Sequence, residues 1–348
     1  MFSSLALSFL ASCVLTILLL RVTIILAKRY RMFSYKRLRD IHQGNVSRFG
    51  GVALFLSFWT IFFLHPLLVI SPLLWGLFSA SIILFAGSIL DDLKEQSWLI
   101  QLCFQVATLF PLMFVGMSIE FIRAPSGEIF YLSHIWGSVM ATLWILFTMN
   151  AFNWLDGLDG LASGVGLMAV CALFFLSLTP QVNQPPLAIM NATMAGALTA
   201  FLMVNMPPAK IFLGTSGALF LGLFLGTQAI VAGGKLATLS LVLAPFFLDA
   251  LWVIFERIKK RHSPFSPDLL HLHFQLFRKG VKKGTILFSY LATSGMLGIL
   301  ALQLGTQGKF FAILLLAIIF ILARSIMSLD ALRKETYNAK YDQKGGRR

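Results

Sequence analysis

Long apolar runs constrain this chain more than any other feature of its sequence. Runs of about 18 or more apolar residues, each long enough to cross a hydrocarbon core of about 30 Å as a helix, recur along its whole length. Only 12% of the 348 residues are charged, against about 25% in a typical soluble domain. The sequence therefore predicts an all-α polytopic integral membrane protein, with residues 1–348 forming a single membrane domain.

The apolar runs predict eleven transmembrane helices. We expect them at 3–27, 49–66, 68–90, 98–118, 135–154, 160–178, 187–204, 214–231, 236–256, 285–304 and 309–327. Lys and Arg concentrate in the loops 28–48 and 257–284 and in the tail 324–348, which all fall on one side of eleven spans. The positive-inside rule makes that side the cytoplasm, so the N-terminus is expected outside and the C-terminus in the cytoplasm.

The charge balance and the cysteines add few functional constraints. Positive-inside bias accounts for the net charge of +14, and no basic face with base-reading side chains is visible, so nucleic acid is not an expected partner. Cys13, Cys103 and Cys171 all fall in apolar segments and are expected to be small core residues. Loop 119–134, on the opposite side from the basic loops, is expected to form a small hairpin around Ser126 and Gly127.

Two adjacent carboxylates, Asp91 and Asp92, end an apolar run in "SILDDLKEQS". They could cap the next helix, where the positive end of its dipole favours them. Adjacent carboxylates repel, however, unless a cation or a proton relieves them. Magnesium prefers such hard oxygen ligands and keeps part of its water shell for substrate phosphates.

The stretch "NAFNWLDGLDGLASG" places four polar side chains at intervals of three residues: Asn150, Asn153, Asp156 and Asp159. In a helix this spacing puts them on one face. A helix cap followed by small-residue packing would also explain the pattern. Ionisable groups near the membrane are costly and usually functional, which favours a site.

Four other motifs fit a phosphate site less specifically. His271 and His273 form an H-x-H pair in the most basic loop, which suits a phosphate or metal but also a solvated surface. "AKIFLGTSGALFLG" and "SRFGGVALF" open helices with glycines, and backbone N–H groups there can hold an anion or simply pack closely. Asp249 sits inside an apolar span, either as a functional carboxylate or as a hydrogen-bonded helix contact.

Together these motifs resemble the polyprenyl-phosphate N-acetylhexosamine-1-phosphate transferases, relatives of phospho-N-acetylmuramoyl-pentapeptide translocase. The resemblance covers roughly residues 40 to 285 and follows the family's order. It rests on "RFGG", "DDLKE", "NAFNWLDGLDGLASG", "AKIFLG", the P-x-x-D of "PFFLD" and "SPFSPDLLHLHF".

The resemblance implies transfer of a sugar-1-phosphate from a UDP-N-acetylhexosamine to a polyprenyl phosphate, with release of UMP, at the cytoplasmic face of the inner membrane. It implies Mg²⁺, or Mn²⁺ in its place, as cofactor, and cell-surface glycan assembly as the setting. The residues expected to act are Asp91 and Asp92 at the lipid phosphate and metal, Asp156 and Asp159 at the nucleotide or metal, His271 and His273 at the diphosphate, Phe212 against the uracil, and Asn150, Asn153 and Arg48 in substrate binding. Asp92, Asp156 and Asp159 are the expected metal ligands.

One departure from the family pattern bears on the metal. The family usually carries Gly-Asp-x-Gly-Ser after "AKxF", and its Asp is a magnesium ligand, whereas this chain has Thr215 there. Because a hydroxyl does not replace a carboxylate at a hard cation, we expect Mg²⁺ to arrive with the nucleotide. A catalytically weakened homologue is therefore the first alternative. A transporter of lipid-linked substrates is the second, although transporters place their polar groups near the midplane.

Overall fold

The computed structural model describes residues 2–30, 46–68, 71–233, 235–265 and 268–345, with side chains as far as Met327. Most of the predicted basic loop 28–48 lies outside these residues, as do most side chains of the tail 324–348. Helices dominate the described chain. They are α1 (Phe2–Arg29), α2 (Gly50–Leu64), α3 (Pro72–Leu93), α4 (Trp98–Phe114), α5 (His134–Leu155), α6 (Leu161–Ser177), α7 (Pro185–Asn205), α8 (Gly214–Val231), α9 (Leu236–Val242), α10 (Ala244–Lys259), α11 (Leu272–Arg278), α12 (Lys283–Gln303) and α13 (Thr306–Gly345).

The helices confirm a multi-pass helical membrane protein. Seven described helices are long and apolar enough to cross a membrane, or eight if a bent pair counts as one span. Three further apolar helices, α2, α4 and α6, have 15, 17 and 17 residues. Every apolar run predicted from the sequence thus contains a helix, whereas length and composition assign fewer full spans than the eleven predicted.

The run 236–256 was expected to be one span, and in the structure it is not one continuous helix. It forms two helices, α9 and α10, that meet at 85°. Pro245 lies in the first turn of α10, where its missing N–H leaves no helical hydrogen bond unmade. In a continuous helix its ring would clash with the carbonyl four residues earlier, so the chain turns at this point.

The loop 119–134 contains the predicted hairpin. Strands β1 (Phe121–Arg123) and β2 (Ile129–Tyr131) pair antiparallel, with Ile122 opposite Phe130. Gly127, at a φ of +94°, donates its N–H to the carbonyl of Ala124. The left-handed conformation suits glycine because it has no Cβ, so the turn follows directly from the sequence.

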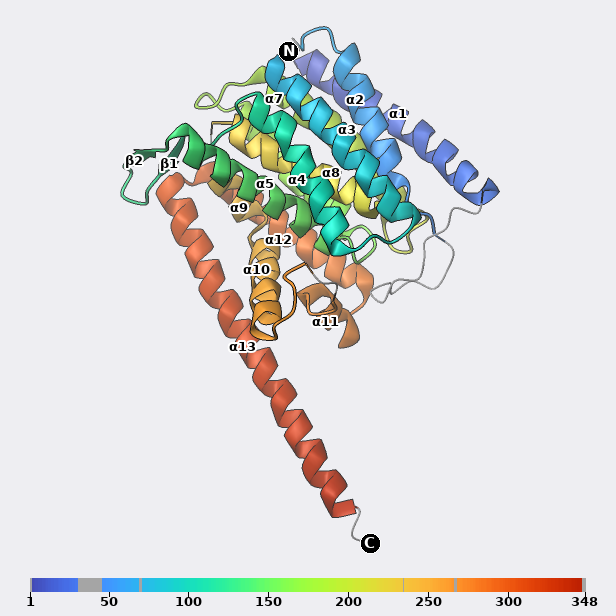
Figure 1. Ribbon diagram of the computed structural model, residues 1–348, viewed down its shortest axis with the longest axis vertical. Coiled ribbons are helices and arrows are strands. Elements are labelled where there is room, and N and C mark those ends of the chain that lie inside the picture. Colours follow the sequence, from blue (N-terminus) through green and yellow to red (C-terminus); the bar gives the residue numbers. More distant parts are fainter. Residues whose placement is uncertain (1, 31–45, 69–70, 234, 266–267, 346–348) are drawn as a thin grey trace.

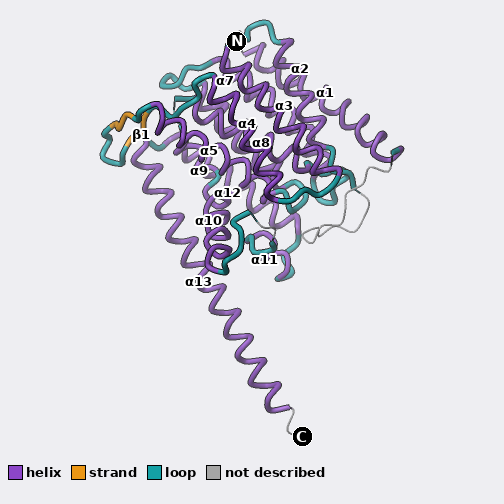
Figure 2. Tube along the Cα trace, in the orientation of Figure 1, coloured by secondary structure: helices purple, strands orange, loops and turns teal. Residues whose placement is uncertain are grey.

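Helix α8 is the centre of the bundle, and all of its residues from Gly214 to Ile230 are buried. At the opposite extreme, only 6% of the membrane-length part of α13 is buried within the protein. In Figure 1, α13 runs past α10 and continues beyond the bundle at the end where α11 also lies. Figure 2 shows loop segments gathered at that same end, below α3, α4 and α8. Most of the polar residues singled out in the sequence lie in the connections between helices or in the helix turns next to them.

Glycines let α8 approach its neighbours closely. A Cβ added to Gly222 would lie 2.6 Å from the Cα of Met149 and 2.7 Å from the carbonyl oxygen of Thr148, both in α5. The indole N–H of Trp144 donates to the carbonyl of Gly226 at 3.0 Å. Since lipid tails are as apolar as the side chains, close van der Waals packing of this kind holds membrane helices together.

We predict that Gly222→Ala destabilises the protein, because the backbone of α5 cannot yield to the added methyl group. Overpacking of this kind costs about 1–3 kcal/mol. Gly298→Ala in α12 is the matched control, since its Cβ would meet only ordinary contacts at 3.5 and 4.0 Å. Thermal unfolding in detergent should show a lower midpoint for Gly222→Ala alone. Equal midpoints for the two variants would contradict the close packing of α5 on α8.

Candidate functional site

The acidic pair at the end of α3 binds the first turn of α8. The Asp92 carboxylate accepts the backbone N–H groups of Thr215 at 2.8 Å and Ser216 at 3.0 Å. The Thr215 hydroxyl donates to Asp91 Oδ2 at 2.7 Å. Asp91 and Asp92 are 1% and 4% exposed, so these are buried, charge-assisted bonds at the positive end of a helix dipole. The acidic pair therefore caps a helix, though it is α8 and not the next helix in sequence.

Asp91 also reaches the start of α4. Its Oδ1 accepts the backbone N–H of Gln96 at 2.8 Å and the side-chain amide of Gln101 at 2.9 Å. The carboxylate therefore joins α8 to the segment between α3 and α4. Because Gln96 and Gln101 both line the pocket described below, Asp91 contacts its wall.

The "RFGG" and "AKIFLG" motifs form one unit. Phe212 donates its N–H to the carbonyl of Ser47 at 2.8 Å, and Gly50 donates to the carbonyl of Phe212 at 3.0 Å. Gly214 adopts a φ of +77°, and a Cβ there would lie 2.1 Å from the Arg48 carbonyl oxygen. Only glycine fits between that backbone and the acidic pair, which explains the glycine that opens α8. Arg48 is itself 9% exposed.

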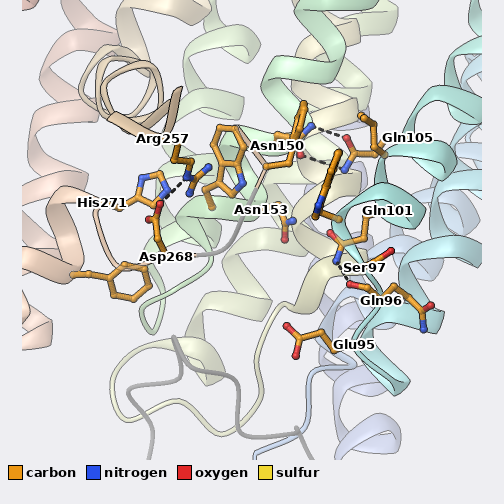
Figure 3. Close-up of a pocket in the computed structure, with 15 residues that line it drawn as sticks. Glu95, Gln96, Ser97, Gln101, Gln105, Asn150, Asn153, Arg257, Asp268 and His271 are labelled. Atoms are coloured by element: carbon orange, nitrogen blue, oxygen red, sulfur yellow. Dashed lines mark hydrogen bonds and ion pairs between the residues drawn. The ribbon is translucent and has the colours of Figure 1, made fainter. Parts of the chain in front are cut away.

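A pocket of about 240 Å³ opens beside Gln96 and Gln101, the partners of Asp91. Figure 3 shows polar side chains from α4, α5, α10 and the His271 loop pointing into it. The lining residues are Glu95, Gln96, Ser97, Trp98, Gln101, Leu102, Gln105, Asn150, Asn153, Trp154, Arg257, Phe265, Asp268, His271 and Phe274. A concave site where several polar side chains converge is the first candidate for a substrate-binding site.

The two asparagines of the sequence stripe both face this pocket. Asn150 donates to Gln105 Oε1 at 2.6 Å and accepts from Gln105 Nε2 at 3.3 Å, a reciprocal amide pair between α4 and α5. Asn153, one turn later, is 7% exposed and lines the pocket. Asn150 therefore fixes the wall through its pair with Gln105, whereas Asn153 lines the pocket.

Arg257 of α10 supplies positive charge to the pocket. Its Nε donates to Asp268 Oδ2 at 2.6 Å, its Nη1 donates to the carbonyl of Pro264, and its guanidinium lies 5.2 Å from the centre of the Trp154 ring. The residue is 2% exposed. Burial of the charge is offset by the carboxylate and the aromatic face, and these contacts fix the plane of the guanidinium.

His271 is held by Asp249. The Asp249 Oδ2 lies 2.9 Å from His271 Nδ1, and the same carboxylate accepts the N–H of Leu272 at 3.0 Å. With Asp249 ionised, Nδ1 carries the proton, and no described residue bonds the buried Nε2 of His271, a residue that lines the pocket. Asp249 is therefore a hydrogen-bonded contact that orients a site residue, which joins the two alternatives left open by the sequence.

His273 is placed differently from His271. Its ring stacks on that of His271 with centroids 5.7 Å apart, and a Cβ on Gly157 would lie 3.1 Å from its Nε2. It therefore faces the Asp156–Gly157 turn and does not line the pocket of Figure 3. Burial, and secondarily the neighbouring His271, lower the pKa of His273 well below its usual value, so the imidazole is neutral at physiological pH.

Asp156 and Asp159 end the stripe in the turn between α5 and α6. Asp156 is the half-buried residue that follows α5, beside the glycine that contacts His273. Asp159 is 3% exposed, and its Oδ2 lies 3.6 Å from Lys283 Nζ and accepts the N–H of Ala209 at 3.4 Å. The predicted single helical stripe is thus broken after Leu155, because the chain leaves the helix.

Asn205 ties this turn to the loop before α8. It accepts the N–H of Gly160 at 3.1 Å and the hydroxyl of Ser163 at 2.7 Å, and it donates to the carbonyl of Ile211 at 2.9 Å. The asparagine thereby connects the "NAFNWLDGLDGLASG" and "AKIFLG" motifs. The structure brings all the motifs of the sequence analysis into one connected region.

The described acidic side chains do not form a ready magnesium site. No group of three His, Cys, Asp or Glu residues that could hold a metal gathers within the described ranges. Asp92 is engaged by two backbone N–H groups, and Thr215 gives its hydroxyl to Asp91. At the start of α8, hydrogen bonds thus satisfy the carboxylates of the acidic pair, and the residues there do not form a preassembled metal site.

Several residues that shape the site were not identified from the sequence. They are Arg257, Asp268, Gln101, Gln105, Asn205 and Lys283. Arg257 and Asp268 flank the "SPFSP" stretch, and charged residues so close to an apolar span could have been noticed. The amides carried no comparable signal, because isolated Gln and Asn residues are common at helix ends.

Comparison with known proteins agrees with this architecture. Residues 74–233 match the family model described as glycosyl transferase family 4. The decaprenyl-phosphate N-acetylglucosaminephosphotransferase of Mycobacterium tuberculosis strain H37Rv is 30% identical over 288 residues, which cover 73% of this chain and 71% of that relative. The undecaprenyl-phosphate alpha-N-acetylglucosaminyl 1-phosphate transferase of Thermotoga maritima is 28% identical over 310 residues, covering 88% and 92%.

A third relative is a transferase with a different printed substrate. The phospho-N-acetylmuramoyl-pentapeptide-transferase of Chlamydia trachomatis serovar L2 is 32% identical over 212 residues, covering 57% of this chain and 61% of the relative. The chain is thus a multi-pass membrane protein of the phosphotransferase type. The chain belongs to glycosyl transferase family 4.

We predict that Thr215→Asp makes the stability of the empty protein depend on Mg²⁺. The new carboxylate would meet Asp91 where the hydroxyl now donates at 2.7 Å, and two carboxylates so close require a cation or a proton. Without metal the variant should lose about 1–3 kcal/mol, the cost of an unmet buried polar group. Added Mg²⁺ should restore its unfolding midpoint in a thermal shift assay.

Thr215→Ser is the matched control, because it keeps the hydroxyl donor. Neither it nor the wild type should respond to Mg²⁺ without nucleotide. Tight Mg²⁺ binding by the empty wild type, measured by titration calorimetry, would refute this account of Thr215.

Proposed function

We propose that this protein transfers an N-acetylhexosamine-1-phosphate from a UDP-sugar to a polyprenyl phosphate, undecaprenyl phosphate in a bacterial membrane, and releases UMP. The observation that carries the proposal is the pocket of Figure 3, where Arg257, His271 and Asn153 converge beside a wall bonded to Asp91. The relatives named above act on polyprenyl phosphates or are named as N-acetylglucosamine-phosphate transferases, which supports the same reaction here.

In the proposed reaction, an oxygen of the polyprenyl phosphate attacks the sugar-linked phosphorus of the nucleotide sugar. A new P–O–P bond forms to the lipid, the bond between the two phosphates of the nucleotide breaks, and UMP leaves. Phosphoryl transfer of this kind depends mainly on positioning and charge stabilisation. A phosphate with a second pKa near ~6 is already largely deprotonated at neutral pH, so Asp91 or Asp92 need not act as a base and would orient the phosphate only through a cation shared with it.

The remaining residues are assigned by their positions. Arg257 and His271 would contact the diphosphate, Asn153 would bind the sugar or ribose, and Phe212 with Arg48 would bind the nucleotide base and phosphate. Asp156 and Asp159 would act at the nucleotide side, next to the neutral His273. We include Mg²⁺, or Mn²⁺ in its place, only as an ion brought by the nucleotide, since the described carboxylates form no preassembled cage.

The pocket is proposed to face the cytoplasm of the inner membrane, with the N-terminus outside and the C-terminus inside. The charge of the basic segments supports this orientation. A green fluorescent protein fused to the C-terminus should therefore fluoresce, and an alkaline phosphatase fused there should be inactive. The opposite pair of results would reverse the assignment of the pocket to the cytoplasm.

We predict that Asp92→Asn and Asp156→Asn each lower turnover by at least ~10²-fold, the scale typical of electrostatic groups at a reacting phosphate. The assay follows UMP and lipid-linked product from purified protein in nanodiscs with undecaprenyl phosphate and UDP-N-acetylhexosamines. Asp156→Asn should keep the wild-type unfolding midpoint, because Asp156 is half-buried in a turn. Asp92→Asn should also lower the midpoint, because Asp92 caps α8.

Three outcomes of this assay separate the candidate functions. Product and UMP from the wild type support the transferase, and near-normal turnover by both variants would remove these carboxylates from the site. A wild type inactive on every UDP-N-acetylhexosamine but rescued by Thr215→Asp would indicate a weakened homologue. Movement of lipid-linked sugar across vesicles without UMP release would indicate a transporter.

A further inference from the structure

The last long helix carries one buried arginine on an otherwise outward-facing surface. Arg324 of α13 is 5% exposed, whereas its neighbours Ile321, Leu322 and Ile326 are 50%, 58% and 60% exposed. A charged side chain inside a membrane helix is costly and usually functional. Its burial against the bundle therefore requires a specific set of partners.

Those partners belong to the loop that carries His271. Arg324 Nη2 donates to the carbonyl of Leu270 at 3.0 Å and lies 4.0 Å from Asp249 Oδ1. The guanidinium also lies 5.6 Å from the centre of the Trp252 ring. The contact with Leu270 links positions 54 residues apart. The last helix, α13, therefore contacts the loop that forms part of the candidate site.

Asp249 also contacts the turn that carries His271, at the two residues that follow Leu270. It accepts the backbone N–H of Leu272 at 3.0 Å and pairs with the imidazole of His271 at 2.9 Å. Three consecutive residues, 270 to 272, are thus held through a carbonyl, an imidazole and an N–H. The positive charge of Arg324 offsets the negative charge of Asp249. The carboxylate is thereby stabilised next to His271, which lines the pocket and whose buried Nε2 has no partner among the described residues.

We propose that Arg324 is a positioning residue, which together with Asp249 clamps residues 270–272 so that His271 presents Nε2 to the substrate pocket. The inference rests on the proposed transferase function for its kinetic test, but the clamp itself is a statement about the loop. Under this proposal α13 is part of the site machinery, although it lies outside residues 74–233 that match the family model.

The alternative is that Arg324 only anchors α13 to the bundle. Loss of such an anchor would affect folding, and it would reduce the activity of any variant whether or not His271 is present. A positioning residue acts through His271, so its effect must vanish when His271 is absent.

The test is a double-mutant cycle on the full-length protein in nanodiscs. Arg324→Gln removes the charge, and we expect it to lower kcat about 10-fold or more with a smaller change in KM for the UDP-sugar, the scale of losing an outer group that orients a site residue. Arg324→Lys keeps the charge and should recover part of the loss. In a His271→Ala background, Arg324→Gln should lower kcat no further.

Lys309→Gln is the matched control. Lys309 is a buried cation at the other end of the same helix, 9% exposed, with its Nζ bonded to Thr238 at 2.8 Å. Its replacement should leave kcat and KM within about twofold of wild type, since loss of one hydrogen bond away from the pocket changes anchoring only. Should Arg324→Gln fail to fold, Arg324→Lys takes its place in the cycle, and its own loss of kcat must vanish with His271→Ala.

Hydrogen exchange of the backbone N–H of Leu272 supplies a readout without substrate. The exchange should be faster in Arg324→Gln than in wild type and unchanged in Lys309→Gln, even if the protein turns over no UDP-sugar. A wild type without transferase activity would therefore overturn the proposed function alone. Unchanged exchange in Arg324→Gln, a kcat within twofold of wild type, or an equal loss of kcat with and without His271 would overturn the clamp.

Discussion

The bond between the acidic pair of α3 and the first turn of α8 is the contact on which the rest of the site depends. Asp92 accepts two N–H groups that have no partner within the helix, and Thr215 returns a hydroxyl to Asp91. Through these hydrogen bonds, two buried carboxylates lie at the end of the most buried helix, and donors of that helix compensate their negative charge. The neighbouring glycine, Gly214, is what allows the Arg48 backbone to lie against the same corner.

From this corner the polar network extends in two directions. Through Gln101, Asp91 reaches the pocket wall of α4 and α5, where the Asn150–Gln105 pair fixes the spacing. Through the loop before α8, Asn205 reaches the turn that carries Asp159. The polar side chains of an oily protein are thus gathered into one hydrogen-bonded region, because each would be costly if buried alone.

The opposite wall is built by elements from the second half of the chain. The bend between α9 and α10 directs α10 so that Asp249 and Arg257 meet the His271 loop. Arg257 and Arg324 are both buried and both lie over tryptophan rings, Trp154 and Trp252. The charge of Arg257 therefore faces a pocket that is proposed to take a diphosphate, and Asp268 and Asp249 are the carboxylates paired with Arg257 and Arg324.

The sequence alone determined the class of fold and indicated part of the candidate site. Apolar runs long enough to span a bilayer become helices because lipid offers no partner to an open backbone, so the helical segments, the hairpin at 119–134 and the polar motifs could be predicted. The tertiary structure decided what spacing along the chain does not encode. It placed Thr215 against Asp91, turned His273 away from the pocket that His271 lines, broke the predicted span at Pro245, and joined Arg324 to a loop 54 residues earlier. These are contacts between distant segments, and their geometry depends on how closely the helices pack, which local pattern does not specify.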